Sequence, residues 1–122
     1  MTQEEMLTHV DHTLLTQAAT WNEIKQIRES GAQFRLGMPQ DSEYEKQWYV
    51  KEAVDYVDGK LAICTVIGFP NGYSTTAAKV FMAKDAVNNG AKEVDMVINI
   101  GWLKDKKYDE LEKEIKAIKE AV

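Results

Sequence analysis

Hydrophobic positions along the chain follow two periods, and together they predict strands that alternate with helices. Residues 61–69 are apolar on both sides of the pleat, as expected for a parallel strand covered on both faces. Segment 92–101 reads as a second buried strand, in which residues 94–98 are apolar apart from one aspartate. Apolar residues spaced by three and four predict helices in the intervening segments. The expected helices span residues 2–9, 20–31, 42–57, 75–88 and 108–122.

Capping patterns mark the starts of several of these helices. Thr20 and Glu23, like Ser42 and Glu45, have the spacing of a capping box, in which each side chain bonds the other residue's backbone N–H. Ser74 or Thr75 can cap the helix expected to end at residue 88. These positions predict where three helices begin.

Two further strands are less regular. Residues 10–15 can form a short strand containing β-branched residues. Residues 34–38 make a poor central strand, because Gly37 weakens pairing and Arg35 would need a buried partner. Segment 28–48 therefore has two interpretations: it contains this strand, or it extends the helix expected at residue 42 and leaves a three-stranded core.

The order of elements favours an α/β fold. Strands and helices alternate along the chain: helix, strand, helix, doubtful strand, helix, strand, helix, strand, helix. This regular alternation predicts a parallel sheet with right-handed crossovers. Two closures fit: an open doubly wound sheet of four strands, or four βα units of a (βα)₈ TIM barrel. With 122 residues the chain is expected to form a single domain, 1–122, with one core.

Charge and composition narrow the function classes. A net charge of −5 without a basic stripe argues against a nucleic-acid partner. The apolar runs are shorter than the ~20 residues that span a bilayer, and the N-terminus lacks a signal pattern, so we expect no membrane partner and a cytoplasmic location. The single cysteine, Cys64, agrees with a reducing compartment.

A carboxylate inside an apolar strand is the main candidate for chemistry. Asp95 interrupts the second apolar run, where burial without a partner costs several kcal/mol. At the carboxyl end of a barrel strand it would point to the mouth where such enzymes keep their chemistry, so a functional role is favoured over a buried structural one. Asp11 has the same character. His12 is expected to pack or to hydrogen-bond, because no cluster with zinc spacing accompanies it.

Two other features have both a plain and a functional interpretation. Residues 68–73, GFPNGY, form a ligand loop or simply a Pro-Gly turn. Met82 lies in an apolar stripe that is wider than one covered face needs, so it faces a second layer or an oligomer interface. Lys60 and Lys92 flank the two apolar runs, and the remaining lysines are assigned to polar helix faces or loops.

The motifs HVDHTLL, CTVIGFPNG, TTAAKVFMAKDAVNNGA and EVDMVINIG occur in this order, and with them the chain resembles deoxyribose-phosphate aldolase. The similarity covers roughly residues 7–27 and 49–122. The resemblance implies a (βα)₈ barrel and a class I aldolase. Such an enzyme reversibly cleaves 2-deoxyribose 5-phosphate to acetaldehyde and glyceraldehyde 3-phosphate through a lysine Schiff base, without a cofactor or metal.

The resemblance also implies roles for individual residues. Asp95 would transfer protons beside the Schiff-base lysine, and Asp11 would belong to the same polar network. Thr13 and Phe69 would lie near the substrate. In the family the nucleophilic lysine is on the sixth strand and a second lysine on the seventh, beyond what resembles the fourth helix here. We therefore expect this chain alone to be inactive.

Two positions depart from the family pattern. Segment 28–48 is charged, lacks the family's cysteine-containing strand and is a few residues longer. Met82 stands where a glutamate usually follows the helix lysine, here Lys79, by three positions. Truncation, a changed reading frame or design would each explain such departures, and the coding DNA would separate them.

Three hypotheses follow from these observations. The first is a piece of an aldolase that binds its small phosphorylated sugar only when a complementary half completes the barrel. The second is a non-catalytic, self-associating half barrel or engineered scaffold, because open sheet edges and an uncovered apolar layer promote homo-oligomers. The third is a flavodoxin-like binding module, for which the sequence has no ligand motif.

Overall fold

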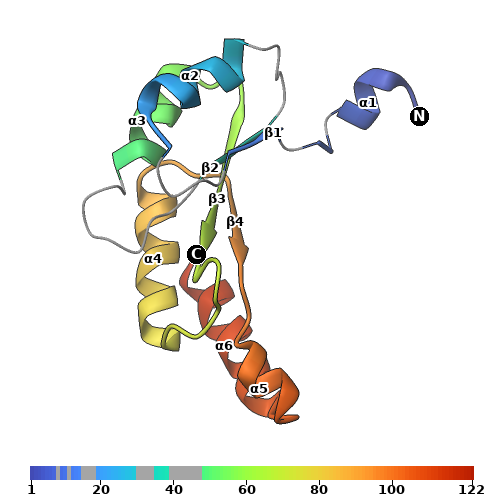
Figure 1. Ribbon diagram of the computed structural model, residues 1–122, viewed down its shortest axis with the longest axis vertical. Helices are drawn as coiled ribbons and strands as arrows, with labels where there is room; N and C mark the ends of the chain where they lie inside the picture. Colours follow the sequence, from blue (N-terminus) through green and yellow to red (C-terminus); the bar gives the residue numbers. More distant parts are fainter. Residues whose placement is uncertain (8, 11, 15–18, 30–34, 39–47) are drawn as a thin grey trace.

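A computed structural model describes residues 1–7, 9–10, 12–14, 19–29, 35–38 and 48–122, and within these ranges it holds six helices and four strands (Figure 1). In chain order they are α1 (Gln3–Leu7), β1 (His12–Thr13), α2 (Trp21–Glu29), β2 (Arg35–Met38), α3 (Trp48–Val57), β3 (Ala62–Ile67), α4 (Thr76–Asn88), β4 (Glu93–Met96), α5 (Ile100–Lys104) and α6 (Tyr108–Ala121).

The strands form one parallel sheet in the order β1-β2-β3-β4. Each strand pairs with its neighbour in sequence, so strand order never reverses as it does in a doubly wound sheet. Sequential parallel strands joined by helices are the arrangement of a (βα)₈ barrel. Of the two predicted closures, the structure therefore supports the partial barrel of four βα units.

β2, which the sequence predicts only weakly, is present and lies between β1 and β3 in the sheet. β2 pairs with β1 through Leu36 and Gly37, and with β3 along all four of its residues. The expectation that this segment is a poor central strand is wrong, because backbone hydrogen bonds to two neighbours hold it whatever its side-chain propensities. The three-stranded alternative is excluded.

The two faces of the sheet differ. Ile63 and Ile67 on β3 belong to the two clusters of buried apolar residues, and Val94 and Met96 on β4 pack against them. In register, Thr65 pairs with Val94 and Ile67 with Met96, so these residues share the face that the helices cover. Residues at the alternate positions point to the opposite face, which is the interior of a barrel.

The helices form two apolar clusters against the sheet. The first cluster joins α2 and α3 to β3, and the second joins α4 and α6 to β3. Met82 is half-buried and packs against the second cluster, so the second-layer interpretation of this residue is the one confirmed. Trp21 on α2 stacks on Tyr49 of α3 with ring centroids 6.4 Å apart, which adds an aromatic contact between these helices.

The capping predictions are confirmed where the structure describes them. Thr20 and Glu23 satisfy each other: the backbone N–H of Thr20 donates to Glu23 Oε2 at 2.7 Å, and that of Glu23 to Thr20 Oγ1 at 3.4 Å. The Thr20 N–H and the Thr20 hydroxyl, which donates to the same Oε2 at 2.8 Å, lower the pKa of the Glu23 carboxyl from 4.5. The small contribution of this carboxylate to stability is therefore lost as the pH falls through the lowered value. Thr75 is the cap of α4. The pattern at Ser42 and Glu45 lies outside the described residues.

The carboxyl-terminal part contains one element that the pattern does not predict. β4 ends at Met96, earlier than expected, and Asn99 then caps the short helix α5 by accepting a hydrogen bond from the Trp102 N–H at 3.1 Å. α6 occurs as predicted. Only Leu111 and Ile118 of its apolar stripe are buried, and Tyr108, Ile115 and Val122 are exposed. The apolar stripe of α6 is therefore wider than the surface that the fold covers.

Candidate functional site

The barrel-interior face of the sheet carries the candidate aspartate. Asp95 is the third residue of β4 and pairs in register with Val66 on β3. Its neighbours Val94 and Met96 face the helices, so strand alternation directs Asp95 to the opposite face, and the residue is exposed. The aspartate thus lies on the face that forms the inside of a closed barrel.

This placement corrects the expectation that Asp95 is buried at a cost. Cys64 and Val66 on the same face of β3 are buried, but Asp95 on the neighbouring strand is exposed, so water reaches its carboxylate. The aspartate is compatible with an apolar strand because it belongs to the open face, while Val94 and Met96 supply the buried one.

We expect Asp95→Asn to change the free energy of unfolding by less than about 0.5 kcal/mol, since an exposed side chain outside any cap or network has little effect. Urea unfolding followed by circular dichroism would measure it. Ile67→Val serves as the sensitive control, because Ile67 on the neighbouring strand β3 is fully buried. This substitution should lower the free energy of unfolding by about 0.5–1.5 kcal/mol. A loss at Asp95 as large as that at Ile67 would mean that the carboxylate has a structural partner.

Thr13 shares the open face with Asp95 but lies at the other edge of the sheet. In register, Thr13 pairs with Gly37, Gly37 with Cys64, and Cys64 with Glu93, two residues before Asp95. Three strand spacings of about 4.8 Å separate β1 from β4. The two side chains therefore line one surface without touching. Asp11 lies outside the described residues.

Phe69 stands at the carboxyl end of β3, in the loop formed by residues 68–72. This loop closes with a hydrogen bond from the Gly72 N–H to the Gly68 carbonyl at 2.8 Å. Gly72 rests against the segment after β4: a Cβ built on it would lie 2.0 Å from the Ile98 carbonyl oxygen. The 68–72 loop therefore adjoins the strand that carries Asp95, at the edge of the sheet where βα-barrel enzymes place their sites.

A buried ion pair lies directly beneath this loop. Lys79 on α4 and Glu114 on α6 are 0% and 1% exposed, and Nζ lies 2.7 Å from Oε1. Lys79 Nζ also donates to the Gly72 carbonyl at 2.7 Å, and Thr76 Oγ1 donates to Glu114 Oε2 at 3.0 Å. The prediction that every lysine outside the strands lies on a polar helix face or loop is wrong for Lys79.

The helical spacing contains a signal for this pair. Lys79 precedes the buried Ala83 and Ala86 by four and seven residues, and Glu114 lies three and four residues from the buried Leu111 and Ile118. Both charges therefore occupy core-facing positions of their helices. A pattern built from apolar residues alone misses them. The Nζ of Lys79 is enclosed and bound to two oxygens, so this lysine is not available as a nucleophile.

Metal-ligating groups do not gather in the described ranges. Among these residues no cluster of three or more histidine, cysteine, aspartate or glutamate side chains could hold a metal ion. Over the same residues, no helix has both the length and the apolar character that crossing a bilayer requires.

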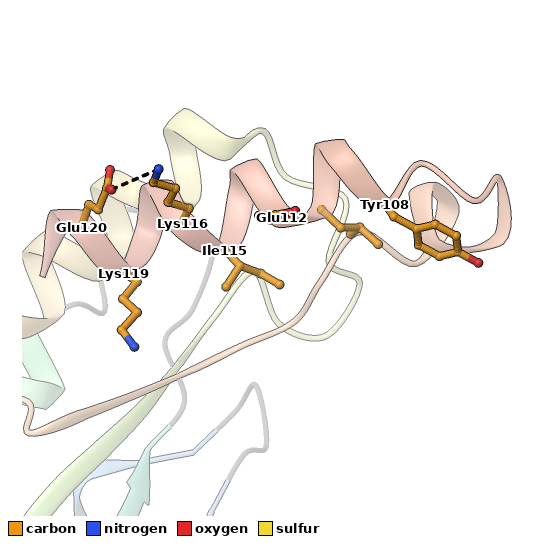
Figure 2. Close-up of a pocket in the computed structure, with 7 residues that line it drawn as sticks. Tyr108, Glu112, Ile115, Lys116, Lys119 and Glu120 are labelled. Atoms are coloured by element: carbon orange, nitrogen blue, oxygen red, sulfur yellow. Dashed lines mark ion pairs between the residues drawn. The ribbon is translucent and has the colours of Figure 1, made fainter.

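Two hollows lie along α6, away from Asp95. The first has a volume of about 630 Å³, and Figure 2 shows Tyr108, Ile115 and Lys119 around it, with the Lys116–Glu120 ion pair at its rim. The second, of about 470 Å³, lies between α6, β4 and the end of α4, and shares Ile115 and Lys119 with the first. We call this continuous surface the α6 seam. Neither hollow includes Thr13, Phe69 or Asp95, so the seam is separate from the candidate site.

Comparison with known proteins confirms the resemblance that the motifs indicate. No protein-family model matches the chain. It is 52% identical over 121 residues to deoxyribose-phosphate aldolases from Streptococcus pyogenes serotype M4 and Streptococcus agalactiae serotype Ia. This similarity covers 99% of the chain but only 52% of each relative. The chain therefore spans about half the length of the curated relatives it matches.

Solved structures show the same proportion. The aldolase QR15 matches with a TM-score of 0.81 at 28% identity, over 94% of this chain and 50% of that one. A tetrameric deoxyribose-phosphate aldolase from Aeropyrum pernix matches with a TM-score of 0.71 at 25% identity, over 97% of this chain and 49% of that one. The four βα units are thus similar to about half of an aldolase fold.

Proposed function

We propose that this chain is the N-terminal half of a class I deoxyribose-phosphate aldolase and contributes Asp95 to an active site that a second half completes. The observation that carries the proposal is the 52% identity along nearly the whole chain, which covers only half of each relative. In this proposal residues 1–122 form one domain, and segment 28–48 is its departure from the family pattern.

The proposed reaction assigns the chemistry to both halves. A lysine amine from the second half adds to the aldehyde carbon of 2-deoxyribose 5-phosphate, and loss of water gives a protonated Schiff base. Removal of the C3 hydroxyl proton then breaks the C2–C3 bond, which releases glyceraldehyde 3-phosphate and leaves an enamine. Water and protons convert the enamine to free lysine and acetaldehyde. In this proposal Asp95 relays protons at the carbinolamine, and the exposure of its side chain on the interior face of the sheet supports this role.

The α6 seam and the β4 edge support the idea of a missing half. Within the described part of the chain, β4 is the last strand of the sheet and pairs with β3, so its outer side is where a further barrel strand would add. Beside it, Ile115 and Val122 are 44% and 54% exposed although they belong to the apolar stripe of α6. We propose that the next βα unit of the completed barrel occupies this place, with its strand parallel to β4 and its helix over Ile115. That occupant is the part of the relatives beyond this chain.

The isolated chain is expected to form no Schiff base, because Lys79 is buried and engaged by two oxygens, and the other lysines that the structure describes are at least partly exposed. Incubation with acetaldehyde followed by borohydride, with intact-mass and peptide analysis, would test this. A full-length relative treated in parallel is the positive control. A stoichiometric adduct on one lysine of the isolated chain would contradict the proposed division of roles.

A second candidate is a non-catalytic half barrel that associates with itself. The same seam and open edges favour it, and the tetrameric Aeropyrum pernix neighbour shows that related folds assemble. Light scattering of the isolated chain, together with the adduct test, separates the two candidates. A stable homo-oligomer that excludes the complementary half favours the scaffold. Exchange of the homo-oligomer for a complex with that half favours the enzyme.

The location and ligand follow from the same proposal. We place the chain in the cytoplasm, since a single buried cysteine, Cys64, is compatible with a reducing compartment. The ligand would be a small phosphorylated sugar, held only in the completed barrel. No cofactor is part of the proposed reaction.

A further inference from the structure

The Lys79–Glu114 pair has a function that helix packing alone does not explain. Both side chains are fully buried, and removing two charges from water costs energy that their attraction only partly returns. Apolar residues of similar size at these positions would hold α4 and α6 together at least as well. An apolar side chain, however, could not donate to the Gly72 carbonyl, as Lys79 does at 2.7 Å.

Lys79 contacts the 68–72 loop at both ends. Its aliphatic stem runs beneath Gly68, where an added Cβ would lie 2.9 Å from Lys79 Cε. Its ammonium binds the carbonyl of Gly72 at the other end. The side chain thus spans the loop from its first residue to its last, and the residues between them, Phe69, Pro70 and Asn71, are exposed.

Glu114 fixes the direction of the ammonium. Its two carboxylate oxygens are divided between partners, Oε1 accepting from Lys79 Nζ at 2.7 Å and Oε2 from Thr76 Oγ1 at 3.0 Å. Because Thr76 is the first residue of α4, the carboxylate is anchored to the same helix that carries Lys79. The network therefore connects α6, the start of α4 and the closing residue of the loop.

We propose that Lys79 and Glu114 are positioning residues that hold the 68–72 loop, and with it Phe69, beside the Asp95 strand for the substrate of the completed aldolase. This inference rests on the proposed function for its substrate. The link to the strand is direct, since the Gly72 backbone packs against Val97 and Ile98, which follow β4. The pair touches no reacting atom and acts through the loop.

The test is amide hydrogen exchange in the isolated chain, followed by NMR. The variant Lys79→Met/Glu114→Leu removes both charges together and should retain the unfolding midpoint. We expect exchange of the Gly72 amide, which donates to the Gly68 carbonyl, to accelerate by about tenfold or more. The Lys92 and Val97 amides, which bond β3 carbonyls, should be unchanged. Lys51→Met, in the exposed pair with Asp55, is the control and should alter none of them.

Unchanged Gly72 exchange in the folded double variant would overturn the proposal and leave the pair with a packing role. Thr76→Val provides a second test that keeps both charges, and it too should accelerate Gly72 exchange without moving the midpoint. Unfolding of the double variant would assign the pair to stability and would likewise count against the proposal. None of these measurements needs catalysis, so they stand apart from the proposed function. In the completed barrel the double variant should lower kcat/KM by about tenfold or more at an equal midpoint.

Discussion

Gly72→Ala is expected to destabilise the chain by about 3 kcal/mol or more, through backbone strain and overpacking together. Gly72 has φ +74°, a conformation that side chains disfavour. The added methyl group would lie 2.0 Å from the Ile98 carbonyl oxygen and 2.9 Å from Val97 Cγ1. Since one of these atoms is backbone, the loop or the segment after β4 must move.

Gly59→Ala is the matched control for this effect. Gly59 has nearly the same backbone angle, φ +71°, but an added Cβ would meet nothing within 4 Å. It should cost about 1–2 kcal/mol, from the backbone conformation alone. Urea unfolding of both variants would isolate the steric part. Equal losses of unfolding free energy in the two variants would show that Gly72 does not press against Ile98. They would contradict a direct contact between the 68–72 loop and the segment that follows β4.

The sequence predicts best those parts of the fold that local rules determine. The consecutive apolar residues of β3 indicate a strand covered on both sides, and residues 63–67 are all buried. The capping pair Thr20 and Glu23 forms the expected reciprocal bonds. In such places, local hydrogen bonding and burial favour the same structure.

Prediction fails where tertiary pairing or a short-range cap overrides the pattern. β2 is a strand because β1 and β3 pair with it on either side, which its own composition does not indicate. β4 ends early because Asn99 caps α5, and a single asparagine is a weak signal for a helix of five residues. Both differences come from interactions that a search for apolar periodicity does not detect.

The candidate site is predicted in part. Asp95 was identified by its position in an apolar strand, and the structure places it on the barrel-interior face, although exposed instead of buried. Lys79 and Glu114 escape prediction because charged residues are normally assigned to solvent. Their contact joins residues 35 positions apart, and only the fold shows that each is the other's partner.

The second large effect is expected on activity. When this chain is combined with a separate polypeptide containing the part of the Streptococcus pyogenes relative beyond the match, we expect retro-aldol cleavage of 2-deoxyribose 5-phosphate. Neither piece alone should release acetaldehyde, because the proton-transfer carboxylate and the Schiff-base lysine would reside on different chains. Asp95→Asn in the mixture should lower the rate by about 10²–10⁴-fold, the usual contribution of a general acid or base.

A matched variant separates this role from a general loss of charge. Asp55→Asn removes another exposed carboxylate, on α3, whose partner is Lys51 on the same helix. It should leave the rate of the mixture unchanged. A similar loss of rate in both variants would mean that the effect of Asp95 comes from the net charge of the complex and not from proton transfer.

The most direct measurement is borohydride trapping in the mixture of the two polypeptides, with the modified lysine located by peptide mass spectrometry. We predict one adduct, on a lysine of the added polypeptide, together with acetaldehyde release that depends on Asp95 of this chain. An adduct on a lysine of this chain, or a stable complex of the two halves that forms no adduct, would contradict the proposal that this half barrel contributes the carboxylate of a divided aldolase site.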